Sequence, residues 1–170
     1  GQSFFLWLGC WYLDVLDAVF QTAPEHVSVI GGRAMNGGLM DHGWAVLRYP
    51  GARIGAFEFS LVAVGDVKIT LYVAGTKAEL EADLLSGICR QRRRGQSWQE
   101  VNRPASKPIH GFVGAREMIN NFVRAVSGDE AARSGPAVIR RVHEAAIACE
   151  EAASEQQSVP VTPLILEGEA

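Results

Sequence analysis

Hydrophobic residues recur along the chain either at helical spacing or at every second position. The change from one spacing to the other divides the chain into three regions. Residues 4–20 are apolar on almost every face of a helix, which is typical of a helix buried between layers. Residues 26–101 alternate with a period of two, and residues 111–126 and 136–153 return to helical spacing. Residues 159–161 predict an edge strand. This order predicts an α+β fold, with helices gathered on one face of a mainly antiparallel, open-faced sheet.

The expected strands are separated by residues that favour tight turns. Pro50-Gly51 joins two strands as a hairpin, and Gly65-Asp66 turns the chain again. Short strands joined in this way indicate antiparallel pairing. They are expected at residues 26–35, 43–49, 53–64, 67–74, 79–85, 88–94 and 97–101.

The second face of the expected sheet is not polar. A sheet with one solvent-facing side should carry polar residues there. On the hairpin strand the face opposite Phe57, Phe59 and Leu61 is instead apolar, with Ile54, Ala56, Val62 and Val64. We expect a second copy of the chain to cover this face and form a homo-oligomer. The alternative is that the chain's own tail covers this face, or that it is left with scattered apolar groups.

Composition narrows the possible partners. The chain has 170 residues, 48% hydrophobic and 21% charged, with a net charge of −3, which suits a globular domain without general attraction to nucleic acid or membrane. Cys10, Cys89 and Cys149 form no C-x-x-C pair, so we expect neither a zinc site nor a disulfide framework, and we predict a cytoplasmic location. The four histidines are scattered, and no metal site is expected.

One basic cluster stands out. Residues 90–94 read Arg-Gln-Arg-Arg-Arg. We expect this run to form a solvated edge strand, because charge on an edge blocks unwanted strand pairing. A phosphate or nucleic-acid site is the lesser alternative, because no aromatic residues are interleaved with the arginines.

Several short strings, taken in order, resemble a known domain. They are Trp7-Leu8-Gly9-Cys10-Trp11, the string DHGWAVLRYPGARIGAFEFS, the string VAGTKAEL and the string EMINNFVRAVS, which is followed by an alanine-rich helix. Over about residues 1 to 163 this set resembles the C-terminal domain of the Gfo/Idh/MocA family, which includes glucose–fructose oxidoreductase, inositol dehydrogenase and dihydrodiol dehydrogenase-like enzymes.

The resemblance implies the substrate-binding and oligomerisation domain of an NAD(P)-dependent oxidoreductase, residues 1–163, with a tail at 164–170. In that family an N-terminal Rossmann domain binds NAD or NADP and supplies a catalytic lysine. The chain has no G-x-G-x-x-G string, so we expect it to hold no cofactor-binding residues and to be inactive alone. We also expect it to be a fragment of a larger protein; a small processed protein is the alternative.

The first helix departs from the family pattern. The family carries Asp-x-Gly-x-His or Asp-x-Gly-Cys-Tyr there, whereas this chain has Trp7 in place of the Asp and Trp11 in place of the His or Tyr. An indole only donates a hydrogen bond and cannot exchange a proton, so no catalytic residue is predicted. The candidate substrate-binding residues are Trp7, Cys10, Trp11 and His110; Asp14 is interpreted as structural.

Two interpretations of these substitutions remain open. In the first, the indoles line a pocket for an apolar or aromatic substrate. In the second, they fill the site as core, and the chain is a catalytically silent binding or scaffold module that kept the fold and lost the site.

Overall fold

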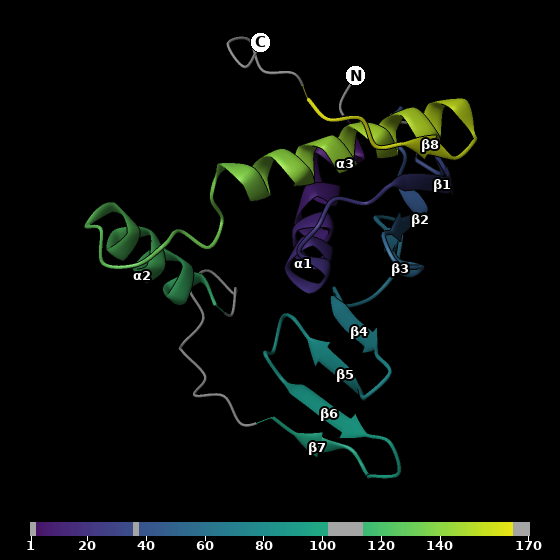
Figure 1. Ribbon diagram of the computed structural model, residues 1–170. Coiled ribbons are helices and arrows are strands. Elements are labelled where there is room, and N and C mark those ends of the chain that lie inside the picture. The colour runs from purple at the N-terminus through teal and green to yellow at the C-terminus, as the bar shows by residue number, and fades with distance from the viewer. Residues whose placement is uncertain (1–2, 36–37, 102–113, 165–170) are drawn as a thin grey trace. The chain divides into compact units, whose positions relative to one another are not determined.

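The chain folds into two compact units, each built around its own antiparallel sheet. The computed structural model describes residues 3–35, 38–101 and 114–164 (Figure 1). One unit comprises residues 1–64 and 134–170, and the other comprises residues 65–133. The predicted α+β class and antiparallel pairing are confirmed, but the strands are divided between two four-stranded sheets, where the sequence led us to expect one.

The first unit combines three helical segments with a sheet of strand order β3-β2-β1-β8. Its helical segments are the π-helix η1 (Phe5–Gly9), α1 (Cys10–Phe20) and α3 (Pro136–Glu155). Its strands are β1 (His26–Gly32), β2 (His42–Tyr49), β3 (Arg53–Ser60) and β8 (Val159–Pro160). Pro136 occupies the first turn of α3, as predicted, because its missing N–H is not needed there.

Aromatic rings fill the space between the first helix and the inner face of this sheet. Phe4 stacks on Phe59 with ring centroids 3.9 Å apart, and the Phe20 ring stacks on Tyr49 at 4.0 Å. Helix α3 contributes small buried side chains to the same core, which allows its backbone to approach β1 closely. These are Ala145, Ala146, Ala148, Cys149 and Ala152.

The outer face of the same sheet exposes large apolar side chains among a few charged ones. The register places Ile30 opposite Trp44, and Arg48 opposite Ile54. Ile30 is 80% exposed and Ile54 is 68% exposed. The apolar second face predicted from the sequence is therefore present over β1, β2 and β3, and no described residue of this unit covers it.

The second unit contains a meander of strands in the order β4-β5-β6-β7, together with helix α2. The elements are β4 (Thr70–Ala74), β5 (Ala78–Asp83), β6 (Cys89–Arg93), β7 (Gln99–Glu100) and α2 (Ala115–Val126). Cross-strand ion pairs join β5 to β6: Arg90 Nη2 lies 2.7 Å from Glu81, and Arg92 binds Glu79. Such pairs directly across a ladder stabilise its register.

Three expectations about these elements need correction. The strand expected at 53–64 ends at Ser60, and the next begins only at Thr70, because the intervening chain turns at Gly65 with φ +136°. Strand β6, which carries the basic run, is not an edge strand, because it pairs with both β5 and β7. The first helix is not buried on all sides, because Leu6, Trp7, Trp11 and Val19 remain exposed.

Among the described helices, none combines the length and apolar character that a membrane crossing requires.

Candidate functional site

The candidate site begins at a π-helical turn. Residues Phe5–Gly9 form a π-helix that continues directly into α1. Such turns are rare and occur frequently at functional sites. A Cβ added at Gly9 would lie 3.1 Å from Cδ1 of Phe5 and 3.4 Å from Cε1 of Phe4. The glycine therefore gives these two rings the room to pack beneath the turn.

Two contacts anchor this turn to helix α3. The Glu150 carboxylate accepts a hydrogen bond from the Ser3 hydroxyl and one from the Phe5 N–H at 3.2 Å. The Ser3 hydroxyl oxygen also accepts a bond from the Leu6 N–H at 3.1 Å. Free N–H groups at the start of the helix are thus satisfied, and a negative charge lies where the helix dipole favours it.

The two indoles of the candidate site are exposed, Trp7 on this turn and Trp11 in the first turn of α1. Trp7 is 56% exposed and Trp11 is 55% exposed. A core role would require both to be buried, as Phe5 beside them is. The described residues therefore give no support to the interpretation that the indoles fill the site as core, and they leave an aromatic surface available for contact.

Cys10 and Asp14 lie next to the indoles on the same helix. The Cys10 thiol donates to the Trp7 carbonyl at 3.3 Å, and burial raises the pKa of that thiol. Desolvation, with a smaller contribution from the Asp17 carboxylate, also raises the pKa of Asp14. Cys10 is therefore held as a neutral thiol, and Asp14 is the one acidic group that lies one turn beyond Trp11 on α1. His110, the fourth predicted residue, lies outside the described residues.

We tested whether these residues fit a dinucleotide or a metal ion. A dinucleotide needs a glycine-rich turn between a strand and a helix N-terminus. Gly31 and Gly32 instead lie within β1, which pairs with β2, and no such turn joins a strand to a helix in the described residues. The same residues hold no group of three His, Cys, Asp or Glu side chains suited to a metal. The described chain therefore does not fit NAD(P).

In the second unit an aromatic ring contacts the basic run, which the order of residues in the sequence did not predict. The Trp98 ring lies against two guanidinium groups, with centroid distances of 5.2 Å to Arg90 and 4.8 Å to Arg92. No aromatic residue is interleaved with the arginines in the sequence, but the structure places this ring against them. The turn between β6 and β7 folds Trp98 back against the arginines, although it follows them in sequence.

Comparison with known proteins identifies the domain to which this geometry corresponds. Residues 1–81 match the family model of the GFO/IDH/MocA C-terminal domain. The comparison with curated protein sequences found no match.

Solved structures extend the likeness over nearly the whole chain. A levoglucosan dehydrogenase in complex with NADH aligns with a TM-score of 0.77 at 14% identity, over 92% of this chain and 50% of that one. The WlbA dehydrogenase from Bordetella pertussis, in complex with NADH and UDP-GlcNAcA, aligns with a TM-score of 0.72 at 16% identity, over 96% and 49%. A UDP-N-acetylglucosamine 3-dehydrogenase from Acidithiobacillus ferrooxidans aligns with a TM-score of 0.73 at 17% identity, over 86% and 45%.

At these identities the likeness shows the fold, and the chain spans about half the length of each of these proteins. The resemblance that the sequence strings suggested is confirmed over residues 1–81, which match the model of the Gfo/Idh/MocA C-terminal domain.

Proposed function

We propose that this chain is the substrate-binding and oligomerisation domain of an NAD(P)-dependent oxidoreductase, and that the nucleotide is held by a separate Rossmann domain. The observation that carries the proposal is the exposed pair of indoles, Trp7 on the π-helical turn and Trp11 in the first turn of α1. These residues occupy the positions where the resemblance places a substrate-facing Asp and a His or Tyr. Two of the similar solved structures are described as complexes with NADH, which supports the same cofactor class.

The indoles form a surface rather than a cavity within the described residues. Neither Trp7 nor Trp11 lines the concavity at the end of the second sheet or the one on the outer face of the first. A cofactor domain laid against this surface would supply the second wall of a pocket. Flat aromatic walls bind apolar or ring-shaped groups well, so we propose an apolar, aromatic or sugar-like substrate.

We propose that the outer face of the first sheet is the homo-oligomer interface. Its apolar side chains are exposed and contiguous across three strands: Ile30 on β1, Trp44 and Val46 on β2, and Ile54 on β3. A concavity of about 310 Å³ lies on this face, lined by His26, Ser28, Val46, Arg48, Ile54 and Ser158. Exposed apolar patches rimmed by polar groups mark interaction sites. The three free cysteines are consistent with a cytoplasmic location.

The test of the oxidoreductase assignment uses the complete native gene product. Its intact mass should be near twice that of this chain, and it should bind NADH or NADPH, as measured by the change in nicotinamide fluorescence. In that protein Trp7→Ala should raise the KM for the substrate while leaving the thermal midpoint nearly unchanged, because the indole is exposed. A gene product of this chain's own mass that binds neither nucleotide would overturn the proposal.

Sedimentation velocity tests the interface. Ile54→Arg places a charge on the outer face and should shift the protein toward monomer. Val67→Arg is the matched control, because Val67 is 74% exposed but lies in the second unit. If both variants sediment like the parent, this face is not the interface.

A catalytically silent scaffold module remains the second candidate. The observation in its favour is that neither indole can exchange a proton, so the acid/base groups of the family pattern are missing. The two candidates differ in one result: a scaffold retains its oligomeric state but shows no dehydrogenase turnover with any nucleotide.

A further inference from the structure

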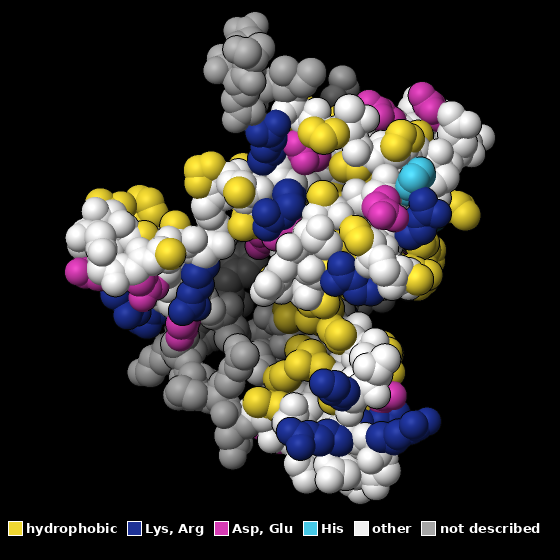
Figure 2. Space-filling model, viewed as in Figure 1, with side chains coloured by type: hydrophobic (Ala, Val, Ile, Leu, Met, Phe, Trp, Pro, Cys, Tyr) yellow, Lys and Arg dark blue, Asp and Glu magenta, His cyan; other side chains and the backbone are white. Residues whose placement is uncertain are grey.

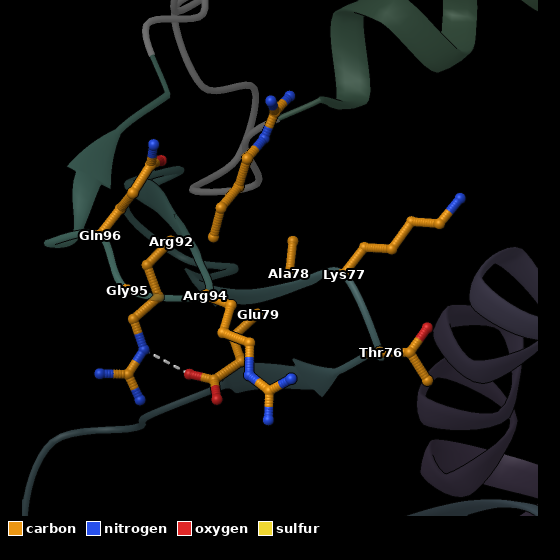
Figure 3. A pocket seen from close by; sticks show the side chains of 10 residues that line it. Thr76, Lys77, Ala78, Glu79, Arg92, Arg94, Gly95 and Gln96 are labelled. Carbon is orange, nitrogen blue, oxygen red and sulfur yellow. Dashed lines mark hydrogen bonds and ion pairs between the residues drawn. The ribbon is translucent and has the colours of Figure 1, made fainter.

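The second sheet carries an open concavity of about 700 Å³ at one of its ends (Figure 3). Its volume lies within the range of small-molecule sites, which occupy roughly 300–1,000 Å³. All of its lining residues belong to the second unit. They are Gly75, Thr76, Lys77, Ala78, Glu79, Arg92, Arg93, Arg94, Gly95 and Gln96.

The meander brings these residues together from two turns. The turn between β4 and β5 is closed by a hydrogen bond from the Gly75 N–H to the Ala78 carbonyl at 2.9 Å. The turn after β6 is closed by a bond from the Gln96 N–H to the Arg93 carbonyl, also at 2.9 Å. Because the strands run antiparallel in the order β4-β5-β6-β7, both turns lie at the same end of the sheet.

This concavity has an excess of positive charge. Glu79 is its one acidic lining residue, and that carboxylate already binds Arg92. Lys77, Arg93 and Arg94 have no acidic partner among the described residues. Figure 2 shows Lys and Arg side chains gathered over the region of β5 and β6. In Figure 3, Arg92 and Arg94 project on the same side as Glu79, whereas Lys77 points away from them.

The arginines of β6 are held in place from two directions. The Glu81 carboxylate accepts two bonds from Arg90, at 2.9 Å and 2.7 Å, while the Trp98 ring packs against both Arg90 and Arg92. A guanidinium fixed in advance loses less conformational entropy when it binds an anion. Arg92 is thus a lining residue that Glu79 and Trp98 hold in place before any ligand binds.

We propose that this concavity binds a small molecule that carries two or more adjacent phosphates. Guanidinium groups recognise phosphate through paired, charge-assisted hydrogen bonds. The Thr76 hydroxyl and the Gln96 amide add neutral donors at its rim. A concavity bounded by two short turns favours a compact ligand over an extended nucleic-acid strand, and the net charge of −3 gives no general attraction for nucleic acid. This inference does not depend on the oxidoreductase assignment.

Isothermal titration calorimetry of the full chain with inorganic pyrophosphate at low ionic strength tests the proposal. The double variant Arg93→Gln with Arg94→Gln should lose at least about tenfold in affinity. The double variant Lys68→Gln with Arg116→Gln is the matched control, because it removes the same charge from exposed positions of the same unit outside the concavity. The control should bind within about twofold of the parent, and affinity should fall as salt is added.

A second variant separates binding from folding. Thr76→Glu places a carboxylate at the concavity without removing an arginine, and it too should weaken pyrophosphate binding by at least about tenfold while the circular dichroism spectrum is retained. Absence of parent binding at millimolar pyrophosphate, or equal binding by the parent and the Arg93/Arg94 variant, would overturn the proposal. So would tighter binding of a single-stranded oligonucleotide than of pyrophosphate, because the surface would then belong to nucleic acid.

Discussion

Arg141 on α3 donates two hydrogen bonds to the carboxylate of Asp17 on α1, from Nε to Oδ1 at 2.7 Å and from Nη2 to Oδ2 at 2.8 Å. Asp17 is buried and Arg141 is half-buried. The hydrogen bonds to Asp17 raise the pKa of the Arg141 guanidinium further. This bidentate pair ties the first helix, which carries the indoles, to the long C-terminal helix.

Breaking this pair should destabilise the first unit more than removing any exposed charge. Arg141→Ala leaves a buried carboxylate without its partner. In a fully buried pair this loss lowers the free energy of unfolding by about 3–5 kcal/mol. We expect about 2–3 kcal/mol here, because the Arg141 guanidinium is partly solvated. Urea unfolding followed by circular dichroism measures this loss. Arg116→Ala, which removes an exposed arginine, is the control and should change stability by less than about 0.5 kcal/mol.

The buried carboxylate of Asp41 should make stability depend on pH in the acid range. Backbone N–H groups of Ala34 and Met35 donate to it at 2.9 Å and 2.7 Å, and together with His42 they lower its pKa to about 2. A carboxyl group whose pKa is lower in the folded than in the unfolded protein stabilises the fold. This contribution is fully present at pH values above its pKa in the unfolded protein, which is about 3.9. That contribution is lost as the pH falls toward 2.

Thermal midpoints measured from pH 5 to pH 2 test this sign. The parent should lose more stability over this window than Asp41→Asn, which has no proton to gain. Asp66→Asn, at an exposed position, should keep the slope of the parent. Identical slopes for the parent and Asp41→Asn would show that another group controls the acid transition.

The three thiols should react at different rates. Cys149 is fully buried, and desolvation, assisted by Glu150, raises the pKa of its thiol. The thiolate is the reactive form, so this residue should resist alkylation in the native protein. Cys10 and Cys89 are partly exposed. Peptide mass mapping after iodoacetamide treatment should find label on these two residues first, and on Cys149 only after denaturant is added. Early label on Cys149 would contradict its burial in the core.

The aromatic residues of the first helix should separate into structural and surface groups. Phe5 is 1% exposed and packs against Phe57 and Phe59, so Phe5→Ala should cost about 3–5 kcal/mol through the cavity it leaves. Trp7→Ala removes an exposed indole and should cost less than about 1 kcal/mol. Chemical denaturation of both variants provides the measurement. An equally large loss for Trp7→Ala would mean that this indole is part of the core.

The local sequence pattern predicted the positions of several helices and turns, because hydrophobic periodicity and turn residues depend only on neighbouring positions in the chain. The first helix, the hairpin at Pro50-Gly51 and the start of α3 at Pro136 all occur where the sequence places them. The string around Gly9 lies within residues 1–81, which match the family model, and this glycine makes room for the Phe4 and Phe5 rings beneath the π-helical turn.

Contacts between distant residues could not be derived in this way. Alternation along β3 identifies two faces, but only the pairing of strands shows that one face is packed under α1 and α3 while the other stays exposed. The sequence by itself determined the α+β order, the family strings and an apolar second face. The tertiary structure alone decided that the strands form two sheets, that Trp98 covers Arg90 and Arg92, and that Trp7 and Trp11 face solvent, because each depends on which distant segments pack together.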